Sequence, residues 1–370
     1  MYKKIILFVT IMALSFLLNA CERAVVDPVL FVYETAMRHG GQVSGMNIRV
    51  FDMDGLLLDL SFGYANEAER LAVDADTVFK WGSITKQLVW ISVLQLYEKG
   101  ELDINADMRT YIPYDMLVNL KYPTSVYHLM THSAGFLESD FPGFLELPVL
   151  FPAHIIHADM PYTVIEYFLK TIEMPQRFEP GEFSGEYSHY GVILASYIVE
   201  QVSGMPFYEY VHEHIFSRLD MAHSSILSDL SDNIWVAEQL KNQVCYLSAD
   251  RRFAVACFPI APPVYMIGGA ISTAADFQKF ALSLLPGDNG SSPLFESDET
   301  LFKLYAAFEY EYAAFTDHGS GIFALSGQMC HTATILLDIN RNLGVIVMTN
   351  QENEGVFNRV SFLRDLLKHL

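Results

Sequence analysis

Apolar side chains cover most of the circumference of the helix that the sequence predicts from Lys86 to Lys99. Gly100 follows it, and glycine is the residue type that most often ends a helix. A helix that is apolar all round is stable only when it is buried, so we expect this one at the centre of the fold. Ser83 comes just before it and therefore lies at the entrance of a buried element. The apolar positions are Leu88, Val89, Trp90, Ile91, Val93, Leu94 and Leu96.

Ser83 and Lys86 form a short motif at the start of this helix. Their spacing places a hydroxyl and an ammonium on one face, one turn apart, and the helix amino terminus adds partial positive charge. A serine hydroxyl becomes a good nucleophile only when a neighbour takes its proton, as a lysine or a tyrosinate can. About one or two such spacings arise by chance in a chain of this length. The motif gains meaning from Tyr187-Ser188-His189, about a hundred residues later, and together the two indicate a serine hydrolase.

Strand and helix signals follow one another in an order that predicts an α+β fold. Two strands, 45–52 and 56–62, are joined through Asp54-Gly55, a strong hairpin signal. A second hairpin, 332–337 with 343–349, comes near the end of the chain, and much of the sequence between them has helical signals. The sequence therefore predicts one antiparallel sheet of about five strands, built from both chain ends and flanked by helices, with a mostly helical subdomain inserted.

We place the α/β part of this fold at about 24–82 and 226–370, and the helical subdomain at about 83–225. Further expected elements are helices at 24–38 and 356–370, a helix opened by Thr273-x-x-Asp276, and strand-like residues around 242–258.

Two cysteines flank this strand-like segment. A three-residue loop at 250–252 would set Cys245 and Cys257 opposite each other, whereas a two-residue loop would send their side chains to opposite faces. A disulfide is therefore allowed but not favoured. Cys330 is expected to be a small buried side chain, and a reactive thiol is the alternative.

The first twenty residues have the features of an export signal. Lys3 and Lys4 precede an apolar run, 5–18, that is too short to span a bilayer comfortably. Leu18-Asn19-Ala20-Cys21 then resembles the cleavage box of bacterial lipoproteins. We therefore predict a signal peptide at 1–20, a mature domain at 21–370, a lipid on Cys21, and a location in the bacterial cell envelope. The alternative is an ordinary secretory signal in which Cys21 is incidental.

The net charge excludes some classes of partner. It is −21, and removal of residues 1–20 would make it −23. Such a chain repels nucleic acid and anionic lipid, so we expect no nucleic-acid partner. The spacing of Cys245, Cys257 and Cys330 fits no zinc site, and the twelve histidines show no metal-type pairing. We therefore expect neither a metal nor another cofactor.

The two motifs and several further blocks resemble the class C β-lactamase and DD-peptidase superfamily of serine hydrolases, which includes esterases. The resemblance covers about 45–370 and implies a β-lactamase/transpeptidase-like fold. The further blocks are Gly63-Tyr64, LQLYEKGELDIN, LMTHSAGF, FEPG, YIVEQVSGMPF, IFSRLDMAHSS, GGAISTAADFQKF and LLDINRNLGVIVMTN.

The resemblance implies a role for each residue of the two motifs. Ser83 corresponds to the acylated nucleophile, and Lys86 to the lysine that lowers the proton affinity of its neighbours. Tyr187 corresponds to the phenol that relays the proton between nucleophile and leaving group. Such roles are chemically sound, because an adjacent ammonium favours the tyrosinate, which can then act as a general base. His132, within THSAG, matches a structural segment of the family.

This sequence departs from the family pattern at two substrate-binding positions. His189 stands where the second motif has an asparagine that binds the acyl side chain. The third motif, normally Lys or His, then Ser or Thr, then Gly, aligns with Leu325-Ser326-Gly327, so a leucine replaces the cation. A registration at His318-Gly319-Ser320 is the alternative. With the first alignment, the backbone N–H groups of Ser83 and Gln328 would form the oxyanion hole.

These features favour a lipid-anchored serine hydrolase that forms an acyl-enzyme on Ser83. Its substrate would be a small or peptidoglycan-like ester or amide. In the family, the third-motif cation pairs with the carboxylate of the substrate. With a leucine in its place, a charge-assisted hydrogen bond worth roughly 1.5–3 kcal/mol is lost, which favours a less anionic substrate than a β-lactam. A catalytically weak binding or scaffold lipoprotein is the alternative, and the sequence leaves the oligomeric state open.

Overall fold

The computed structural model describes residues 44–113, 120–143, 146–151, 163–182, 187–247, 254–256, 260–287, 292–311 and 321–351. The predicted signal peptide, Cys21 and the helices expected at 24–38 and 356–370 lie outside these residues. No helix in the described part of the chain is long and apolar enough to cross a membrane.

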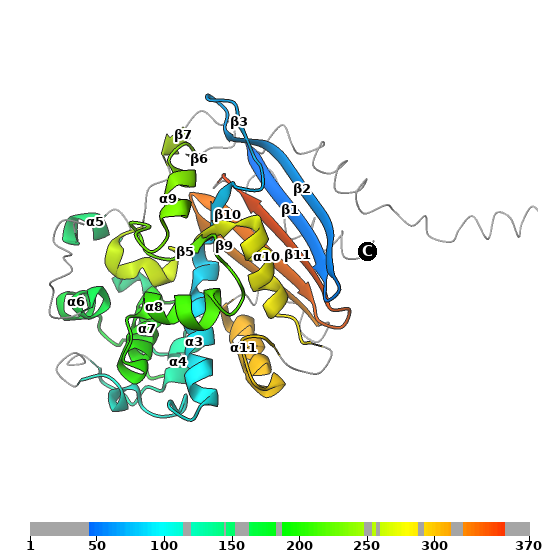
Figure 1. Ribbon diagram of the computed structural model, residues 1–370. Helices are drawn as coiled ribbons and strands as arrows, with labels where there is room; N and C mark the ends of the chain where they lie inside the picture. Colours follow the sequence, from blue (N-terminus) through cyan, green and yellow to red (C-terminus); the bar gives the residue numbers. More distant parts are fainter. Residues whose placement is uncertain are drawn as a thin grey trace, which may run out of the picture.

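An antiparallel sheet of six strands forms one side of the molecule (Figure 1), in the order β3-β2-β1-β11-β10-β9. Strand β1 lies between β2 and β11, so that Ile48 faces Leu60 on one side and Val347 on the other. The sheet is thus built from both chain ends, which confirms the predicted fold class; five strands are long and β3 has two residues. The strands are β1 Gly45–Asp52, β2 Gly55–Asn66, β3 Leu71–Ala72, β9 Ile322–Met329, β10 His331–Asp338 and β11 Leu343–Thr349.

The first hairpin turns where the sequence predicts it. One oxygen of the Asp52 carboxylate accepts hydrogen bonds from the backbone N–H groups of Asp54, at 2.8 Å, and Gly55, at 3.0 Å. Gly55 has φ +141°, in a region that favours glycine. The Asp-x-Asp-Gly segment is therefore a turn. The Asp52 side chain supplies the hydrogen-bond acceptor for its backbone N–H groups.

Helices occupy the middle of the chain and cover one face of the sheet (Figure 1). Helix α3 ends one residue earlier than predicted, and its residues from Lys86 to Leu96 are all buried. The helices are α3 Lys86–Glu98, α4 Val126–Met130, α5 Leu147–Leu150, α6 Val164–Thr171, α7 His189–Ser203, α8 Phe207–Val211, α9 Ile234–Leu240, α10 Ala274–Ser283 and α11 Asp298–Glu311, with a π-helical turn at His212–Phe216.

Two smaller sheets complete the described fold. In the first, β8 pairs with both β4 and β5, and Lys80 of β4 faces Ile271 of β8. The second pairs β6 with β7 and sets Cys245 opposite Val255, so neither register considered for Cys245 and Cys257 is formed. Cys257 lies outside the described residues. The strands are β4 Val78–Lys80, β5 Ser224–Ser225, β6 Val244–Tyr246, β7 Ala254–Ala256 and β8 Ile271–Thr273.

The main hydrophobic core lies between the sheet and the helices. Trp81 is fully buried there, against the rings of Phe216, Phe277 and Phe280. Thr273 caps helix α10, because its hydroxyl accepts the N–H of Asp276 as predicted. The helix itself begins at Ala274 and packs against β1 and β11. A second apolar cluster, including Ile48, occupies the opposite face of the sheet. The division into an α/β part and a helical subdomain stays a prediction.

A buried carboxyl group in α7 makes stability depend on pH. Burial raises the pKa of Glu200 to about 7, although hydrogen bonds from Thr163 and the Phe207 N–H oppose this. Because the pKa of this group in the unfolded chain is lower, near 4.5, the contribution of Glu200 to stability should be fully present below pH 4.5 and should be lost as the pH rises through 7. We expect the loss to be about 3 kcal/mol.

Glu200→Gln should remove this loss, because an amide cannot ionise. Urea unfolding between pH 4.5 and 8 measures the effect. The exposed Glu238→Gln is the control and should keep the wild-type profile. A wild-type profile in Glu200→Gln would contradict the prediction.

Candidate active site

Ser83 lies in a 3₁₀ turn, Gly82–Thr85 (η2), that leads directly into α3. The turn is fixed against the segment that precedes and forms β8. The Trp81 N–H donates to the Ala270 carbonyl at 2.8 Å, and the Trp81 indole donates to the Ser272 hydroxyl at 2.8 Å. The Thr85 hydroxyl accepts the Ala270 N–H at 3.1 Å. The nucleophile candidate is therefore held on both sides by backbone and buried side chains.

Ser83, Lys86 and Tyr187 meet in one hydrogen-bonded group. The Lys86 Nζ and the Tyr187 hydroxyl each lie 2.9 Å from the Ser83 Oγ. The ammonium also lies 4.9 Å from the centre of the Tyr187 ring. These contacts allow a proton to pass between the serine and the phenol beside a fixed positive charge.

The Lys86 side chain has no exposed surface. A buried ammonium is stable only when its donors are used, and its second acceptor is the Ile267 carbonyl, at 2.7 Å. That carbonyl comes from the segment that fixes the Ser83 turn. The same local structure therefore positions both the nucleophile and the cation.

Tyr187 and Ser188 come just before α7. The Ser188 hydroxyl caps this helix by accepting the Gly191 N–H, and the Ser188 N–H donates to the His132 Nδ1 at 3.2 Å. The His132 ring lies 4.7 Å from that of Tyr187. Burial, with the nearby charge of Lys86, lowers the pKa of His132 to about 3, so the ring is neutral. His132 thus supports the tyrosine, as its structural assignment implies, although its Nε2 has no hydrogen-bond partner among the described residues.

His189 is buried beside Tyr187 and bound to a carboxylate that the sequence motifs did not indicate. The Glu138 side chain accepts the His189 backbone N–H at 3.0 Å and bonds the His189 Nδ1. Burial and Lys86 lower the pKa of His189, while Glu138 opposes this. The imidazole is therefore neutral near pH 7, and its Nδ1–H donates to the Glu138 carboxylate. The rings of His189 and Tyr187 lie 5.1 Å apart, edge to face.

The end of β9 lies directly against the Ser83 turn. A Cβ atom added to Gly327 would be 2.0 Å from the Trp81 oxygen and 2.7 Å from the Ser83 nitrogen, and one added to Gly82 would be 2.3 Å from the Gln328 nitrogen. Only glycines allow the two segments to approach so closely. The backbone nitrogens predicted to form the oxyanion hole, those of Ser83 and Gln328, therefore belong to segments in contact.

The side chain of Leu325 does not face the cleft, which corrects our expectation for a substrate-binding residue. Leu325 has no exposed surface and belongs to the main core. Because side chains alternate along a strand, Ser326 points to the opposite face, where its hydroxyl lies 3.4 Å from that of Thr334. The third motif therefore contacts the Ser83 turn through the backbone at Gly327.

The alternative registration of the third motif does not fit the strand. Gly321, which follows that segment, lies against the Asn340 side chain at the other end of β9. Gly327 comes six positions later in the chain, which is about 20 Å along an extended strand. His318 itself lies outside the described residues. The close approach of Gly327 to Ser83 supports Leu325-Ser326-Gly327 as the motif.

Leu325→Lys should consequently destabilise the protein instead of changing its selectivity. The substitution would bury an ammonium in the main core, and the expected loss is about 3 kcal/mol or more. Thermal unfolding measures it, and Leu325→Met, which keeps an apolar side chain of similar volume, is the matched control. An unchanged melting temperature, with a gain in turnover of carboxylate-bearing substrates, would place residue 325 in the cleft after all.

Comparison with known proteins assigns the chain to a family. The family model described as "Beta-lactamase" matches residues 31–369. The chain belongs to the beta-lactamase family. This family member is 26% identical, over 65% of its length, to PbpX of Bacillus subtilis (strain 168), a provisionally named penicillin-binding protein. The match covers 55% of PbpX, so the chain spans about half the length of that relative.

Solved structures show the same fold in relatives of low identity. The octameric penicillin-binding protein homologue from Pyrococcus abyssi superposes with a TM-score of 0.69 at 21% identity, covering 93% of this family member and 77% of the homologue. A beta-lactamase/D-alanine carboxypeptidase from Pseudomonas syringae gives 0.66 at 17% identity, covering 92% and 98%. These matches confirm the β-lactamase/transpeptidase-like fold.

Proposed function

We propose that this protein is a serine hydrolase that forms an acyl-enzyme on Ser83 from an ester or an amide. The observation that carries the proposal is the position of the Ser83 Oγ, 2.9 Å from both the Lys86 ammonium and the Tyr187 hydroxyl. Family membership supports the same chemistry. The proposal includes a lipid on Cys21 and a place in the bacterial cell envelope, which the sequence at 1–21 supports.

The reaction would proceed in two halves. Tyr187, as phenolate beside the Lys86 ammonium, takes the proton of Ser83 while the Ser83 oxygen attacks the carbonyl carbon. The N–H groups of Ser83 and Gln328 stabilise the resulting oxyanion. Tyr187 then gives its proton to the leaving group, and the acyl-enzyme remains. Water attacks the ester carbon as its proton passes to Tyr187. Tyr187 then gives this proton to the Ser83 oxygen while the bond between that oxygen and the acyl carbon breaks, so that the acid leaves and the serine hydroxyl and the phenolate are restored.

The substrate would carry no carboxylate at the position where the family's third-motif cation normally binds one. Leu325 is buried in the core, so it supplies no charge to a substrate. His189, neutral and held by Glu138, replaces an amide as the polar group beside Tyr187. Peptidoglycan-like amides stay within the proposal, because a relative from Salmonella schwarzengrund is provisionally named a D-alanyl-D-alanine carboxypeptidase.

A fluorophosphonate probe and a small substrate panel test the proposal. The probe should label Ser83, and short-chain aryl esters should be turned over faster than a chromogenic cephalosporin or a D-Ala-D-Ala peptide. A protein that is not labelled and turns over none of these substrates would instead be a binding or scaffold lipoprotein. Mass analysis of the mature amino terminus tests the lipid, and an unmodified Cys21 in a soluble protein would refute the anchor.

A further inference from the structure

A pocket of about 170 Å³ lies next to the Ser83 turn and contains no residue of the catalytic group. Gly268, in its wall, directly follows the residue whose carbonyl binds Lys86. A Cβ atom added to Gly268 would lie 3.1 Å from the Met329 side chain, also in the wall, and 3.8 Å from the carbonyl carbon of Gly82. The pocket therefore borders both segments that meet at the nucleophile.

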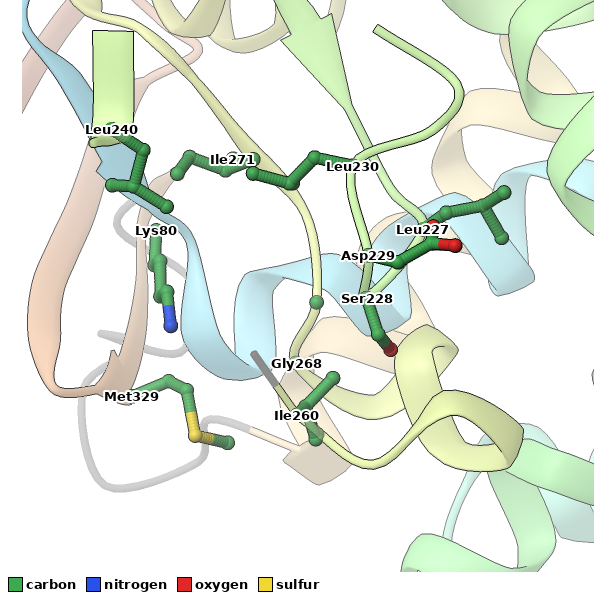
Figure 2. Close-up of a pocket in the computed structure, with 11 residues that line it drawn as sticks. Lys80, Leu227, Ser228, Asp229, Leu230, Leu240, Ile260, Gly268, Ile271 and Met329 are labelled. Atoms are coloured by element: carbon green, nitrogen blue, oxygen red, sulfur yellow. The ribbon is translucent and has the colours of Figure 1, made fainter. Parts of the chain in front are cut away.

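The wall of this pocket is apolar except for a few polar groups (Figure 2). Two of these are deeply buried: Lys80 is 5% exposed and Ser228 is 7% exposed. The third, Asp229, is exposed, and its carboxylate accepts hydrogen bonds from the N–H and the hydroxyl of Ser231. The Ser228 hydroxyl has no hydrogen-bond partner among the described residues. The apolar lining residues include Leu227, Leu230, Leu240, Ile260, Ile271 and Met329.

Lys80 is fixed by its strand. Its N–H donates to the His331 Nδ1 at 3.0 Å, and its backbone pairs with β8 at Ile271. Figure 2 shows its side chain running from β4 toward Met329. Burying an ammonium is costly unless an anion or hydrogen-bond acceptors compensate it. Because an ammonium has three donors, it can bind an anion in addition to its contacts within the protein.

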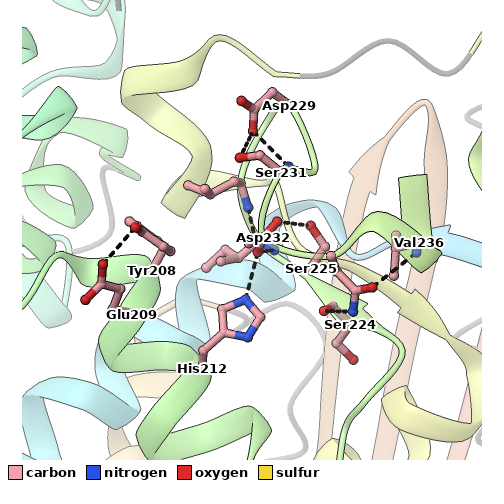
Figure 3. Close-up of polar contacts among 12 residues, drawn as sticks. Tyr208, Glu209, His212, Ser224, Ser225, Asp229, Ser231, Asp232 and Val236 are labelled. Atoms are coloured by element: carbon pink, nitrogen blue, oxygen red, sulfur yellow. Dashed lines mark hydrogen bonds and ion pairs between the residues drawn. The ribbon is translucent and has the colours of Figure 1, made fainter. Parts of the chain in front are cut away.

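Hydrogen bonds to Asp232 hold the loop from Ser225 to Asp232, which includes Ser228, and Figure 3 shows these contacts. The Asp232 carboxylate accepts hydrogen bonds from the Ser225 hydroxyl at 2.5 Å and from the Ile226 N–H at 2.7 Å, and it bonds the His212 Nε2 at 2.8 Å. In a catalytic triad the histidine lies between the carboxylate and the serine and bonds both. Here Ser225 and His212 each bond Asp232, so this group is not a triad. Its effect is to fix the wall of the pocket before a ligand arrives.

Neither Tyr187 nor His189 lines the pocket. The leaving group must take its proton from Tyr187, so the pocket suits the other half of the substrate, the acyl chain. Building on the proposed function, we propose that the pocket binds a short aliphatic acyl chain that ends in a carboxylate. Lys80 would bind this carboxylate, Ser228 would donate a hydrogen bond to it, and the leucine and isoleucine side chains would contact the methylene groups.

Aryl monoesters of succinate, glutarate and adipate, each compared with the neutral ester of matched chain length, test this proposal. For at least one length, kcat/KM should favour the anionic ester by roughly ten- to a hundred-fold, the range of one charge-assisted hydrogen bond. Lys80→Met should reduce this ratio to about one, and Ser228→Ala should reduce it less. The exposed Lys241→Met, one residue from the lining, should keep the wild-type ratio.

A wild-type enzyme that hydrolyses the neutral esters equally well or better at every length would overturn this proposal while leaving the serine hydrolase intact. Lack of probe labelling and of all ester turnover would instead refute the proposed function. If Lys80→Met does not fold, the wild-type ratio still tests whether the enzyme prefers an anionic acyl chain, and Ser228→Ala still tests whether this pocket binds it. A ratio that falls equally in Lys241→Met would show a general charge effect and would also refute a specific role for Lys80.

Discussion

Replacing Ser83 by alanine is expected to abolish labelling by a fluorophosphonate and to lower ester turnover by three or more orders of magnitude. The Ser83 oxygen is the atom on which Lys86 and Tyr187 both converge, at 2.9 Å, and alanine offers nothing for either to activate. Removing a member of such a catalytic unit usually costs about 10⁴- to 10⁶-fold in kcat. Steady-state kinetics with an aryl ester measures the loss.

The fold should survive this substitution, because Ser83 is only half-buried and fills no core position. Circular dichroism and the melting temperature provide that check. Tyr187→Phe should also lose orders of magnitude, and the double variant should lose little more than Ser83→Ala alone, since the two residues act as one unit. Undiminished ester turnover by Ser83→Ala would remove the basis of the assignment.

Gly327→Ala is expected to damage activity and stability together. The added methyl carbon would lie 2.0 Å from the Trp81 oxygen and 2.7 Å from the Ser83 nitrogen. Both are backbone atoms, so β9 and the Ser83 turn must separate. We expect at least a hundred-fold loss in kcat/KM, as for a lost oxyanion-hole donor, and destabilisation of about 2 kcal/mol or more. Ester kinetics and urea unfolding measure the two effects.

Gly191→Ala is the matched control for this substitution. Gly191 lies in α7, and its nearest neighbour would be 3.6 Å from the new carbon, an ordinary contact. Alanine should therefore be neutral or slightly stabilising there. A Gly327→Ala variant that behaves like Gly191→Ala would show that the close approach of β9 to Ser83 is not needed for the reaction.

The sequence predicted elements whose pattern is local. The hairpin at Asp54-Gly55 and the buried helix from Lys86 depend on turn residues and on apolar periodicity, which neighbouring positions reveal. Ser83, Lys86 and Tyr187 were found because their spacing resembles a family motif, and the structure brings all three together.

Features that depend on tertiary contact could not be predicted in this way. Glu138 bonds His189 across 51 residues of sequence, and no local pattern links the two. The one available signal is that a buried imidazole needs a hydrogen-bond partner, which does not say which residue supplies it. Leu325 was aligned with the third motif of the family, but alignment does not say whether a side chain packs into the core. The Ile267 carbonyl carries no sequence signal at all, because every residue has one.

The position of β1 between β2 and β11 also constrains how the protein folds. Met46 pairs with Thr349, so closing the sheet joins parts of the chain 303 residues apart. Such distant pairing carries a large loop-closure entropy and slows folding. Strand β9, which brings Gln328 to Ser83, belongs to the same late part of the chain. A nascent chain that does not yet include β9 would therefore contain Ser83, Lys86 and Tyr187 without Gln328, and the proposed hydrolysis would require synthesis beyond this strand.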